Sequence, residues 1–163
     1  MMENIVYLMP TDTTELSAAA HALLEHVLGF PVRIARGAHG KPFLPEHSGL
    51  HFNLSHTSGA VVCALSGHPV GVDIERARPV RPALAARCFT QAEREYAVDE
   101  ARFLEVWTRK EALLKRDGRG ITVPLRELET TNHPAISTLV VDGFTLSFCG
   151  EPSAFKLVKM ILI

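Results

Sequence analysis

The sequence predicts an α+β protein made of two similar lobes. A helix followed by strands occurs twice along the 163 residues. The amino-acid composition also changes after Glu75, where a basic connector interrupted by prolines separates the two helix-and-strand units. We therefore divide the chain into an N-terminal α+β lobe, residues 1–75, and a C-terminal α+β lobe, residues 76–163.

The N-terminal lobe begins with an apolar strand at residues 3–8 and a helix at residues 14–28. The helix is predicted from a stripe of Leu and Ala at helical spacing, and Gly29 is a suitable stop. A short strand is expected at residues 32–35. Residues 37–49 are rich in Gly, Pro and His and predict a loop.

Three further strands complete this lobe, and they are expected at residues 50–55, 60–66 and 69–75. Ser66-Gly67-His68-Pro69 predicts a hairpin turn between the last two strands. The next lobe starts with helices, expected at residues 82–88, 90–97 and 100–116. Thr90 with Glu93 three residues later is a capping-box pattern, and Asp117-Gly118 ends the longest helix. The chain then returns to strands, at residues 136–142, 143–149 and 155–162.

Composition excludes several classes of protein. The formal net charge is −1, which gives no electrostatic case for binding nucleic acid or an anionic membrane. The three cysteines, Cys63, Cys88 and Cys149, are odd in number and lack metal-type spacing, so we expect reduced thiols, mostly in the core. The first 15 residues do not resemble a signal peptide, and no apolar run is long enough to span a membrane. The cytoplasm is the expected location.

Paired acids carry the most specific chemistry. Asp73 and Glu75 are two residues apart on a predicted strand, so both carboxylates project from the same face. Glu111 lies in the longest predicted helix and could join them. A few oxygen ligands suit Mg²⁺, which keeps some waters and takes others from a substrate phosphate. The alternative is that these acids are solvated, with Glu111 paired to Lys115 at i, i+4.

Two lysines flank Glu111 and would neutralise phosphate charge. Trp107, Glu111 and Lys115 recur every four residues and so share one helix face, while Lys110 lies beside Glu111. The alternative for each lysine is an ordinary surface position.

Ser55-His56 has the residue types of a nucleophile and its base, but adjacent residues of a strand face opposite sides. The serine also lacks a G-x-S-x-G context, so a hydrolase is not expected.

Five segments in a fixed order resemble a known family. They are Gly40-Lys41-Pro42, Asn53-Leu54-Ser55-His56-Thr57, Gly71-Val72-Asp73-Ile74-Glu75, Arg87-Cys88-Phe89-Thr90-Gln91-Ala92-Glu93 and the WxxKEAxxK run from Trp107 to Lys115. All five lie within about residues 40 to 124. The ordered set resembles the 4′-phosphopantetheinyl transferases of the Sfp-like, surfactin-synthetase-activating type.

The resemblance implies a pseudo-twofold fold with the site between the lobes, and a Mg²⁺-dependent transfer of the 4′-phosphopantetheine arm of coenzyme A. The acceptor would be a serine of an apo carrier protein, acyl, aryl or peptidyl, and 3′,5′-ADP would be released. The metal ligands implied are Asp73, Glu75 and Glu111. Glu111 would orient or deprotonate the serine, while Lys110 and Lys115 would neutralise the leaving group.

The same resemblance places further residues on coenzyme A, namely Lys41, Pro42, Ser55, His56 and Lys115. Among them, His56 and Lys41 would bind the 3′-phosphate. Glu93 is a possible site residue that would hold Lys110, although its capping-box role explains it without function. The basic residues of the connector and the helix after it, Arg76, Arg78, Arg81 and Arg87, would steer an acidic carrier protein or simply form a solvated loop.

The chain departs from the family pattern in its first 40 residues. The predicted helix there offers His21 and His26 where relatives carry a basic residue for the adenosine phosphate, and Arg33 and Arg36 come later. This departure gives some support to an alternative function, a non-catalytic module that binds coenzyme A or a carrier protein. A second alternative is the short trimeric holo-synthase, whose metal-binding Asp stands near the N-terminus. Because Asp73 follows a whole lobe, we expect a monomer.

Overall fold

The computed structural model describes residues 2–79, 81–118 and 124–161. The strands are β1 (Ile5–Pro10), β2 (Ala35–Arg36), β3 (Pro42–Phe43), β4 (His51–Thr57), β5 (Ala60–Ser66), β6 (Gly71–Arg76), β7 (Ile136–Val141), β8 (Phe144–Cys149) and β9 (Lys156–Lys159). The helices are α1 (Leu16–Leu28), α2 (Pro82–Cys88), α3 (Gln91–Tyr96), α4 (Glu100–Asp117) and the 3₁₀ turn η1 (Leu125–Glu127). The predicted α+β class is confirmed.

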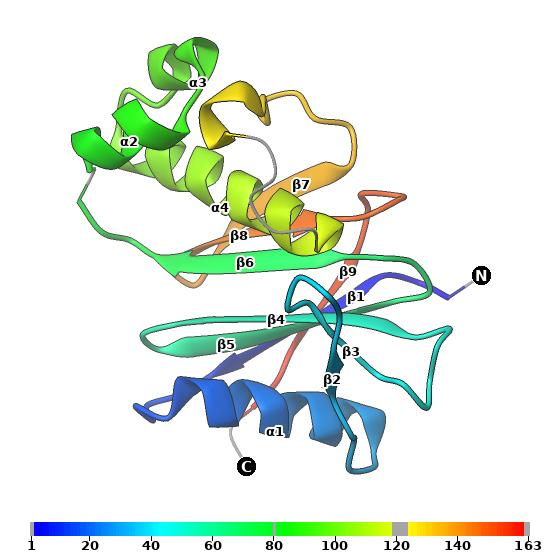
Figure 1. The fold of residues 1–163 in the computed structure, drawn as a ribbon. Helices are drawn as coiled ribbons and strands as arrows, with labels where there is room; N and C mark the ends of the chain where they lie inside the picture. The colour runs from blue at the N-terminus through cyan, green and yellow to red at the C-terminus, as the bar shows by residue number, and fades with distance from the viewer. Residues whose placement is uncertain (1, 80, 119–123, 162–163) are drawn as a thin grey trace.

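These elements form layers (Figure 1). A four-stranded sheet, in the order β4-β5-β1-β9, packs on α1 through one face. Its other face packs against a three-stranded sheet, in the order β6-β8-β7, whose far side is covered by α4. Strands β2 and β3 make a separate two-stranded ribbon beside β4. The acids predicted on β6 therefore lie in the layer next to α4.

The predicted helix ends are confirmed. Gly29 ends α1 in the left-handed conformation, φ 78°, and Gly118 does the same for α4, φ 68°. Thr90 and Glu93 form the expected capping box at the start of α3. The strand expected at 32–35 is shorter and shifted, forming β2. The expected loop at 37–49 contains β3, which pairs with β2. Strand β9 forms within the last predicted strand, residues 155–162, of which residue 162 lies outside the described residues.

The predicted hairpin at Ser66–Pro69 is wrong. Strand β5 pairs with β4 and β1, whereas β6 pairs with β8 in the other sheet. The physical reason is that all seven residues of β5 are buried, as in a central strand whose two edges are already paired. The turn between β5 and β6 therefore crosses from one sheet to the other. Within it, the hydroxyl of Ser66 donates to Asn4 Oδ1 and accepts from the amide of His68.

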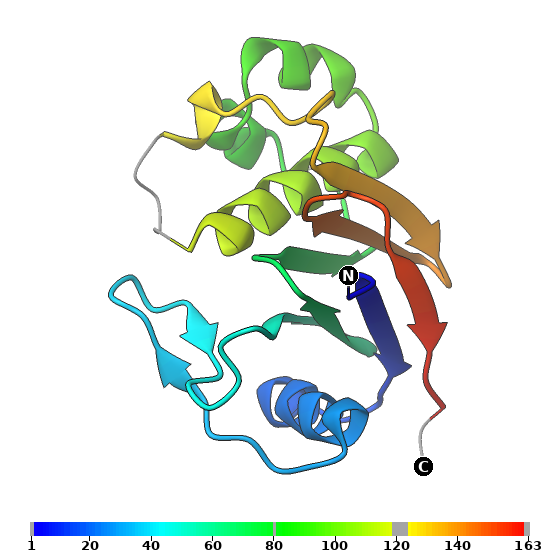
Figure 2. The same cartoon turned by 90° about the vertical axis from the view of Figure 1, so that its right-hand side faces the viewer.

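The two sheets exchange strands across the predicted lobe boundary at Glu75. Strand β6, which precedes the boundary, pairs antiparallel with β8. Strand β9, from the end of the chain, returns to pair parallel with β1 (Figure 2). The division into residues 1–75 and 76–163 stays a prediction, and these pairings show that the sheets themselves do not separate at that point.

The main core lies between the two sheets. It contains Val6, Leu8, Ala60, Val62 and Ala64 from one sheet and Val70, Val72, Ile74, Leu146 and Phe148 from the other sheet or just before it. Each side chain is at most 2% exposed. Burial of this apolar surface fixes the distance and angle between the sheets. It also fixes the position of β6, because every second residue of that strand points into this core.

Strands β4 and β6 are edge strands of different sheets and are joined by side chains. Three alternate residues of β4 each accept a hydrogen bond from a backbone N–H of β6, in place of the carbonyl of a neighbouring strand. The bonds are Val72 N to Asn53 Oδ1 at 2.9 Å, Ile74 N to Ser55 Oγ at 3.4 Å and Arg76 N to Thr57 Oγ1 at 3.3 Å. This side-chain ladder satisfies amides of β6 that would otherwise be unpaired at a buried edge.

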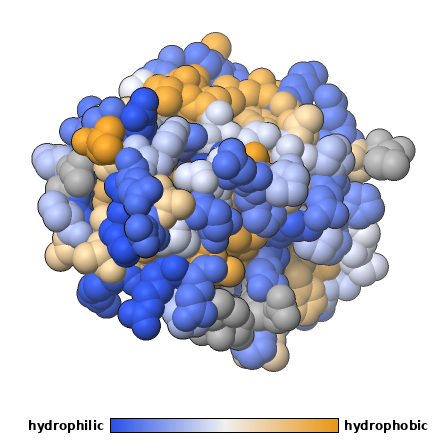
Figure 3. Space-filling model, turned by 90° about the horizontal axis from the view of Figure 1, so that it is seen from above, coloured by the Kyte–Doolittle hydropathy of each residue, from blue (hydrophilic) through white to orange (hydrophobic). Residues whose placement is uncertain are grey.

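The face above the helices is mostly hydrophilic, with separate apolar areas (Figure 3). Among the helices of the described residues, none combines the length and apolar character needed to cross a membrane.

Candidate active site

The two acids of β6 project from the same face, as the strand period predicts. Val72 and Ile74 point into the core between the sheets, so Asp73 and Glu75 point to the other side, toward α4. Lys115 of α4 contacts Asp73, and Trp107 of α4 contacts Glu75. The helix therefore runs along β6 with residues of its predicted face over both carboxylates.

Gly71 allows α4 to approach β6 this closely. A Cβ atom at Gly71 would lie 1.9 Å from the carbonyl oxygen of Ala112 and 2.5 Å from the amide nitrogen of Arg116. Both atoms belong to the backbone of α4, so no side-chain rotation would relieve the clash. A larger residue would push the helix away from the acids.

Asp73 is 5% exposed and only half satisfied. Its Oδ1 accepts from Ser55 Oγ at 2.9 Å and from Lys115 Nζ at 2.8 Å. Its Oδ2 is buried and has no hydrogen-bond partner. Burial raises the pKa of Asp73, while Lys115 and Ser55 oppose that rise. An unpaired buried carboxylate oxygen is costly and therefore marks a position where a cation would bind favourably.

Glu75 lies at the edge of the same cluster. Its Oε1 accepts from Trp107 Nε1 and from Arg78, both at 3.2 Å. Burial raises the pKa of Glu75, and the charge of Asp73 raises it further. The tryptophan, which lies on the predicted face of α4, thus orients this carboxylate.

Glu111 is half-buried between these contacts. None of the described residues donates a hydrogen bond to its carboxylate. Burial raises the pKa of Glu111 first, and the charge of Asp73 raises it further. A carboxylate with a raised pKa is a stronger base while it remains ionised near neutral pH. The structure thus brings Glu111 within electrostatic range of both β6 acids, as predicted.

The expected alternative, an ion pair of Glu111 with Lys115, does not form. Lys115 Nζ instead donates to Asp73 Oδ1, Ser55 Oγ and the carbonyl of Val72. Its side chain is 28% exposed, so the ammonium lies at the border between the buried acids and solvent. Lys115 is therefore placed to meet an anion that enters from outside.

These oxygens fit a hard divalent cation, although no complete site is preformed. In the part of the chain that the structure describes, no three His, Cys, Asp or Glu side chains are already grouped around one point as in a metal site. Asp73 Oδ2 is nevertheless a buried acceptor without a partner, and two further carboxylates lie close by. Mg²⁺ commonly takes only one or two carboxylates and completes its shell with water and substrate phosphate.

Lys110 does not face the β6 acids in this structure, and its expected role toward a phosphate stays a prediction. Its Nζ lies 2.7 Å from Glu93 Oε2, and both side chains have no exposed surface. The ammonium also donates to the carbonyls of Leu125 and Leu128. The carboxylate of Glu93 in turn accepts from the amide and hydroxyl of Thr130. The expectation that Glu93 holds Lys110 is met, but on the side of α4 away from β6.

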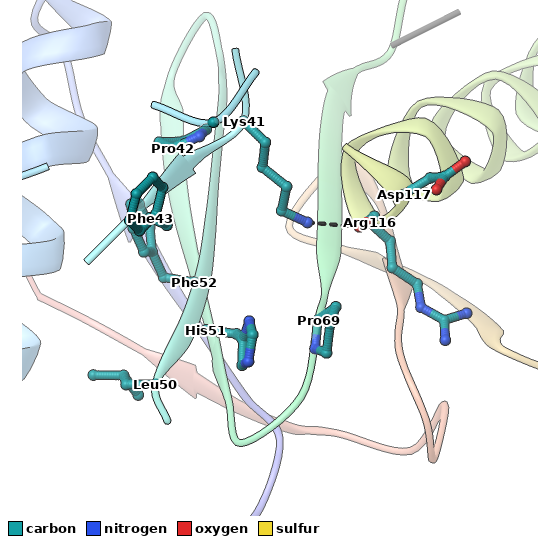
Figure 4. A pocket seen from close by; sticks show the side chains of 10 residues that line it. Lys41, Pro42, Phe43, Leu50, His51, Phe52, Pro69, Arg116 and Asp117 are labelled. Atoms are coloured by element: carbon teal, nitrogen blue, oxygen red, sulfur yellow. Dashed lines mark hydrogen bonds between the residues drawn. The ribbon is translucent and has the colours of Figure 1, made fainter. Parts of the chain in front are cut away.

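Lys41 is also placed differently from its expected role. Its Nζ donates to the carbonyls of Val70, Lys115 and Arg116, at 3.1, 2.7 and 2.6 Å. The three donors of an ammonium are thus used on backbone oxygens at the end of α4. Lys41 and Pro42 line a cavity with Arg116 and His51 (Figure 4). Only their position beside a pocket agrees with the expectation that they bind coenzyme A.

Ser55 and His56 face opposite sides of β4, as the sequence predicts. Ser55 is buried against Asp73, whereas His56 is exposed and its Nε2 lies 3.3 Å from Ser17 Oγ on α1. They therefore do not form a nucleophile–base pair.

The other cations near the site have modest contacts. Arg33 pairs with Glu46 on the surface, and Arg36 donates to the carbonyl of Gly40. Arg78 pairs with Glu75, while Arg76 donates weakly to the carbonyl of Ser58. Arg81 and Arg87 follow at the start of α2 and within it, and both are exposed.

Sequence reasoning missed three positions that shape the site: Asn53, Thr57 and Gly71. The first two carry the side-chain ladder. The sequence pattern that could have revealed these two residues is a polar residue at every second position of a predicted strand, because such a pattern predicts one polar face. The role of Gly71 had no comparable signal, because the backbone that it meets comes from a helix about forty positions later.

Known proteins share this sequence pattern. A family model described as the 4′-phosphopantetheinyl transferase superfamily matches residues 69–157. The 4′-phosphopantetheinyl transferase Sfp of Bacillus subtilis (strain 168) is 31% identical over 108 residues, which cover 63% of this chain and 48% of that protein. The 4′-phosphopantetheinyl transferase gsp of Aneurinibacillus migulanus is 36% identical over 111 residues, covering 63% and 46%.

A third relative matches more of the chain. The 4′-phosphopantetheinyl transferase AcpT of Escherichia coli O157:H7 is 34% identical over 150 residues, which cover 85% of this chain and 76% of that protein. The chain spans about half the length of the Bacillus and Aneurinibacillus relatives. The family match extends over more than half of the chain and includes β6 and α4, which carry the acids. The chain therefore belongs to the 4′-phosphopantetheinyl transferase superfamily, as the resemblance predicts.

Proposed function

We propose that this protein transfers the 4′-phosphopantetheine arm of coenzyme A to a serine of an apo carrier protein and releases 3′,5′-ADP. Membership of the family supports the reaction class. The observation that carries the proposal for this chain is Asp73, whose Oδ2 is buried without a partner beside two further carboxylates. Most buried side-chain polar atoms have a hydrogen-bond partner, so an unpartnered carboxylate oxygen beside other acids supports a bound cation.

The proposed metal is Mg²⁺, held by Asp73, Glu75 and Glu111. When bound, it would neutralise the pyrophosphate of coenzyme A and so favour departure of the leaving group. Lys115 lies at the solvent border of the same cluster, where its ammonium adds positive charge beside the phosphates. Trp107 holds Glu75 in place by its indole N–H.

In the proposed reaction the serine oxygen of the carrier attacks the phosphorus that bears pantetheine. A new P–O bond forms to serine, and the P–O bond to the ADP portion breaks. The serine proton passes to Glu111, directly or through water, because this carboxylate lies beside the proposed metal position and no described residue donates a hydrogen bond to it. No covalent intermediate with the protein is required.

The remaining assignments are also proposals. Ser55 connects Asp73 and Lys115 through its hydroxyl, and we assign it to the pocket wall beside the pyrophosphate. His56, exposed beside α1, is kept as a contact for the 3′-phosphate. We also propose that the protein is a monomer, since residues of both predicted lobes contribute to one site. The cytoplasm stays the proposed location.

The test is incubation with coenzyme A and a panel of apo carrier proteins for fatty-acid, polyketide and nonribosomal-peptide synthesis. Each carrier is analysed by mass spectrometry after reaction with Mg²⁺ or with a chelator. We expect a gain of one phosphopantetheine on the carrier serine only when Mg²⁺ is present. If coenzyme A binds but no carrier gains mass, the protein is instead a binding module.

A further inference from the structure

Lys41 connects the loop between β2 and β3 to the last turn of α4. Its ammonium reaches across to the carbonyl of Arg116 (Figure 4). It also binds the carbonyl of Lys115 and that of Val70, just before β6. Three segments that are far apart in sequence therefore meet at one nitrogen atom. All three of its N–H donors are used by these carbonyls.

The end of α4 is suited to such a cation. The last carbonyls of a helix lack partners within the helix and carry a partial negative charge. Gly118, which ends α4, leaves the space for the lysine stem, because a Cβ atom there would lie 2.4 Å from Lys41 Cδ. Lys41 thus acts as a C-terminal cap supplied from another part of the chain.

One of the three carbonyls belongs to Lys115, whose side chain binds the site. Lys115 Nζ donates to Asp73 at 2.8 Å and to Ser55 at 3.1 Å. We infer that Lys41 is a positioning residue: by capping the last turn of α4 it holds Lys115 against Asp73, and it does not itself bind the 3′-phosphate of coenzyme A. The kinetic part of this inference rests on the proposed function, whereas the structural part does not.

The first experiment compares coenzyme A with dephospho-coenzyme A as substrate. Lys41→Met keeps the length of the stem but removes the ammonium. If Lys41 acts through Lys115, transfer from both substrates falls by the same factor, and the preference between them is unchanged. If Lys41 binds the 3′-phosphate, transfer from coenzyme A falls and transfer from dephospho-coenzyme A does not. That second result would overturn the inference.

The second experiment needs no substrate. The side-chain ammonium or Cε signal of Lys115, assigned by NMR with a Lys115→Arg variant, reports its environment in the ligand-free protein. We expect Lys41→Met to move this signal, and Arg33→Ala, which removes an exposed cation paired with Glu46, to leave it unchanged. An unmoved Lys115 signal in a folded Lys41→Met protein would refute the positioning role, whatever the activity of the protein.

Gly118→Ala provides an independent variant that keeps the charge of Lys41. The added methyl group would displace the lysine stem and, at positive φ, also strain the backbone. We expect the same movement of the Lys115 signal as in Lys41→Met, and little further movement when the two substitutions are combined. Additive movements would show that the substitutions act separately and would contradict the inference. This variant also replaces Lys41→Met if that protein does not fold.

Discussion

Lys110 Nζ lies 2.7 Å from Glu93 Oε2 with both side chains fully buried, whereas the next residue, Glu111, belongs to the cluster over β6. Adjacent residues of α4 therefore serve opposite sides of the helix. Lys110 joins α4 to α3 and to η1 and the residue after it, because its ammonium also binds the carbonyls of Leu125 and Leu128. The lysine supports the helix that carries Glu111.

Lys110→Met should therefore reduce stability strongly. Removing one partner of a buried ion pair leaves the other charge uncompensated and costs about 3–5 kcal/mol. We expect a loss of that size in the free energy of unfolding measured with urea. Lys159→Met is the matched control, since Lys159 pairs with Asp142 on the surface, and exposed pairs contribute roughly 0–1 kcal/mol. Equal, small losses for both variants would show that the buried pair is not structural.

The contrast between Lys110 and Lys115 shows what the sequence could predict. Helical spacing placed Trp107, Glu111 and Lys115 on one face, and the contacts of Trp107 and Lys115 with β6 follow that spacing. The same spacing put Lys110 at the margin of this face, and only the position of Glu93 decides that it turns away. Such a contact depends on how α3 packs against α4, which local pattern does not contain.

For the strands too, the sequence predicts local features but not contacts between distant segments. Their positions followed from alternating and apolar residues, and the common face of Asp73 and Glu75 followed from the strand period. Their pairing partners did not, because pairing depends on which buried edges remain free. The hairpin predicted between β5 and β6 failed for this reason. For Lys41 the local pattern shows only a charge beside a proline, whereas the carbonyls that the lysine caps come from residues 29 or more positions away.

Asn53→Leu should destabilise the protein by removing one bond of the side-chain ladder. The amide of Val72 would then be buried without an acceptor, at a cost of about 1–3 kcal/mol. Thr57→Val removes the corresponding bond at the exposed end, where water can replace it, and should change stability by roughly 0.5 kcal/mol or less. Urea unfolding of both variants measures the difference. If Thr57→Val costs as much as Asn53→Leu, burial does not set the strength of the ladder.

Glu111→Gln should abolish most transfer and leave the fold intact. The amide keeps the shape of the side chain but cannot accept the serine proton, and general-base catalysis contributes about 10²- to 10⁴-fold. We expect a fall in kcat of that order with unchanged circular dichroism and unchanged binding of the carrier. Glu100→Gln, an exposed residue in the first turn of the same helix, is the control. Activity of Glu111→Gln within about tenfold of wild type, or about 1.4 kcal/mol, would remove Glu111 from the mechanism.

Asp73→Asn should stabilise the metal-free protein and weaken its response to Mg²⁺. Burial raises the pKa of Asp73 in the folded protein above its value in the unfolded chain. The folded state therefore binds the proton more tightly, so this group's contribution to stability is fully present below the ordinary pKa of about 3.9. That contribution is lost as pH rises through the raised, folded-state pKa. Asparagine resembles the protonated acid at every pH, so the Asp73→Asn protein keeps this contribution to stability as pH rises.

The stability difference between Asp73→Asn and wild type should consequently grow with pH in the absence of divalent cations. Urea unfolding between acidic and neutral pH measures it, with Asp142→Asn as the exposed control. Mg²⁺ should stabilise wild type by binding the folded state, and should stabilise Asp73→Asn much less. A difference that shrinks as pH rises would show that the Lys115 ion pair outweighs the burial of Asp73. Equal stabilisation of both proteins by Mg²⁺ would show that Asp73 is not a ligand.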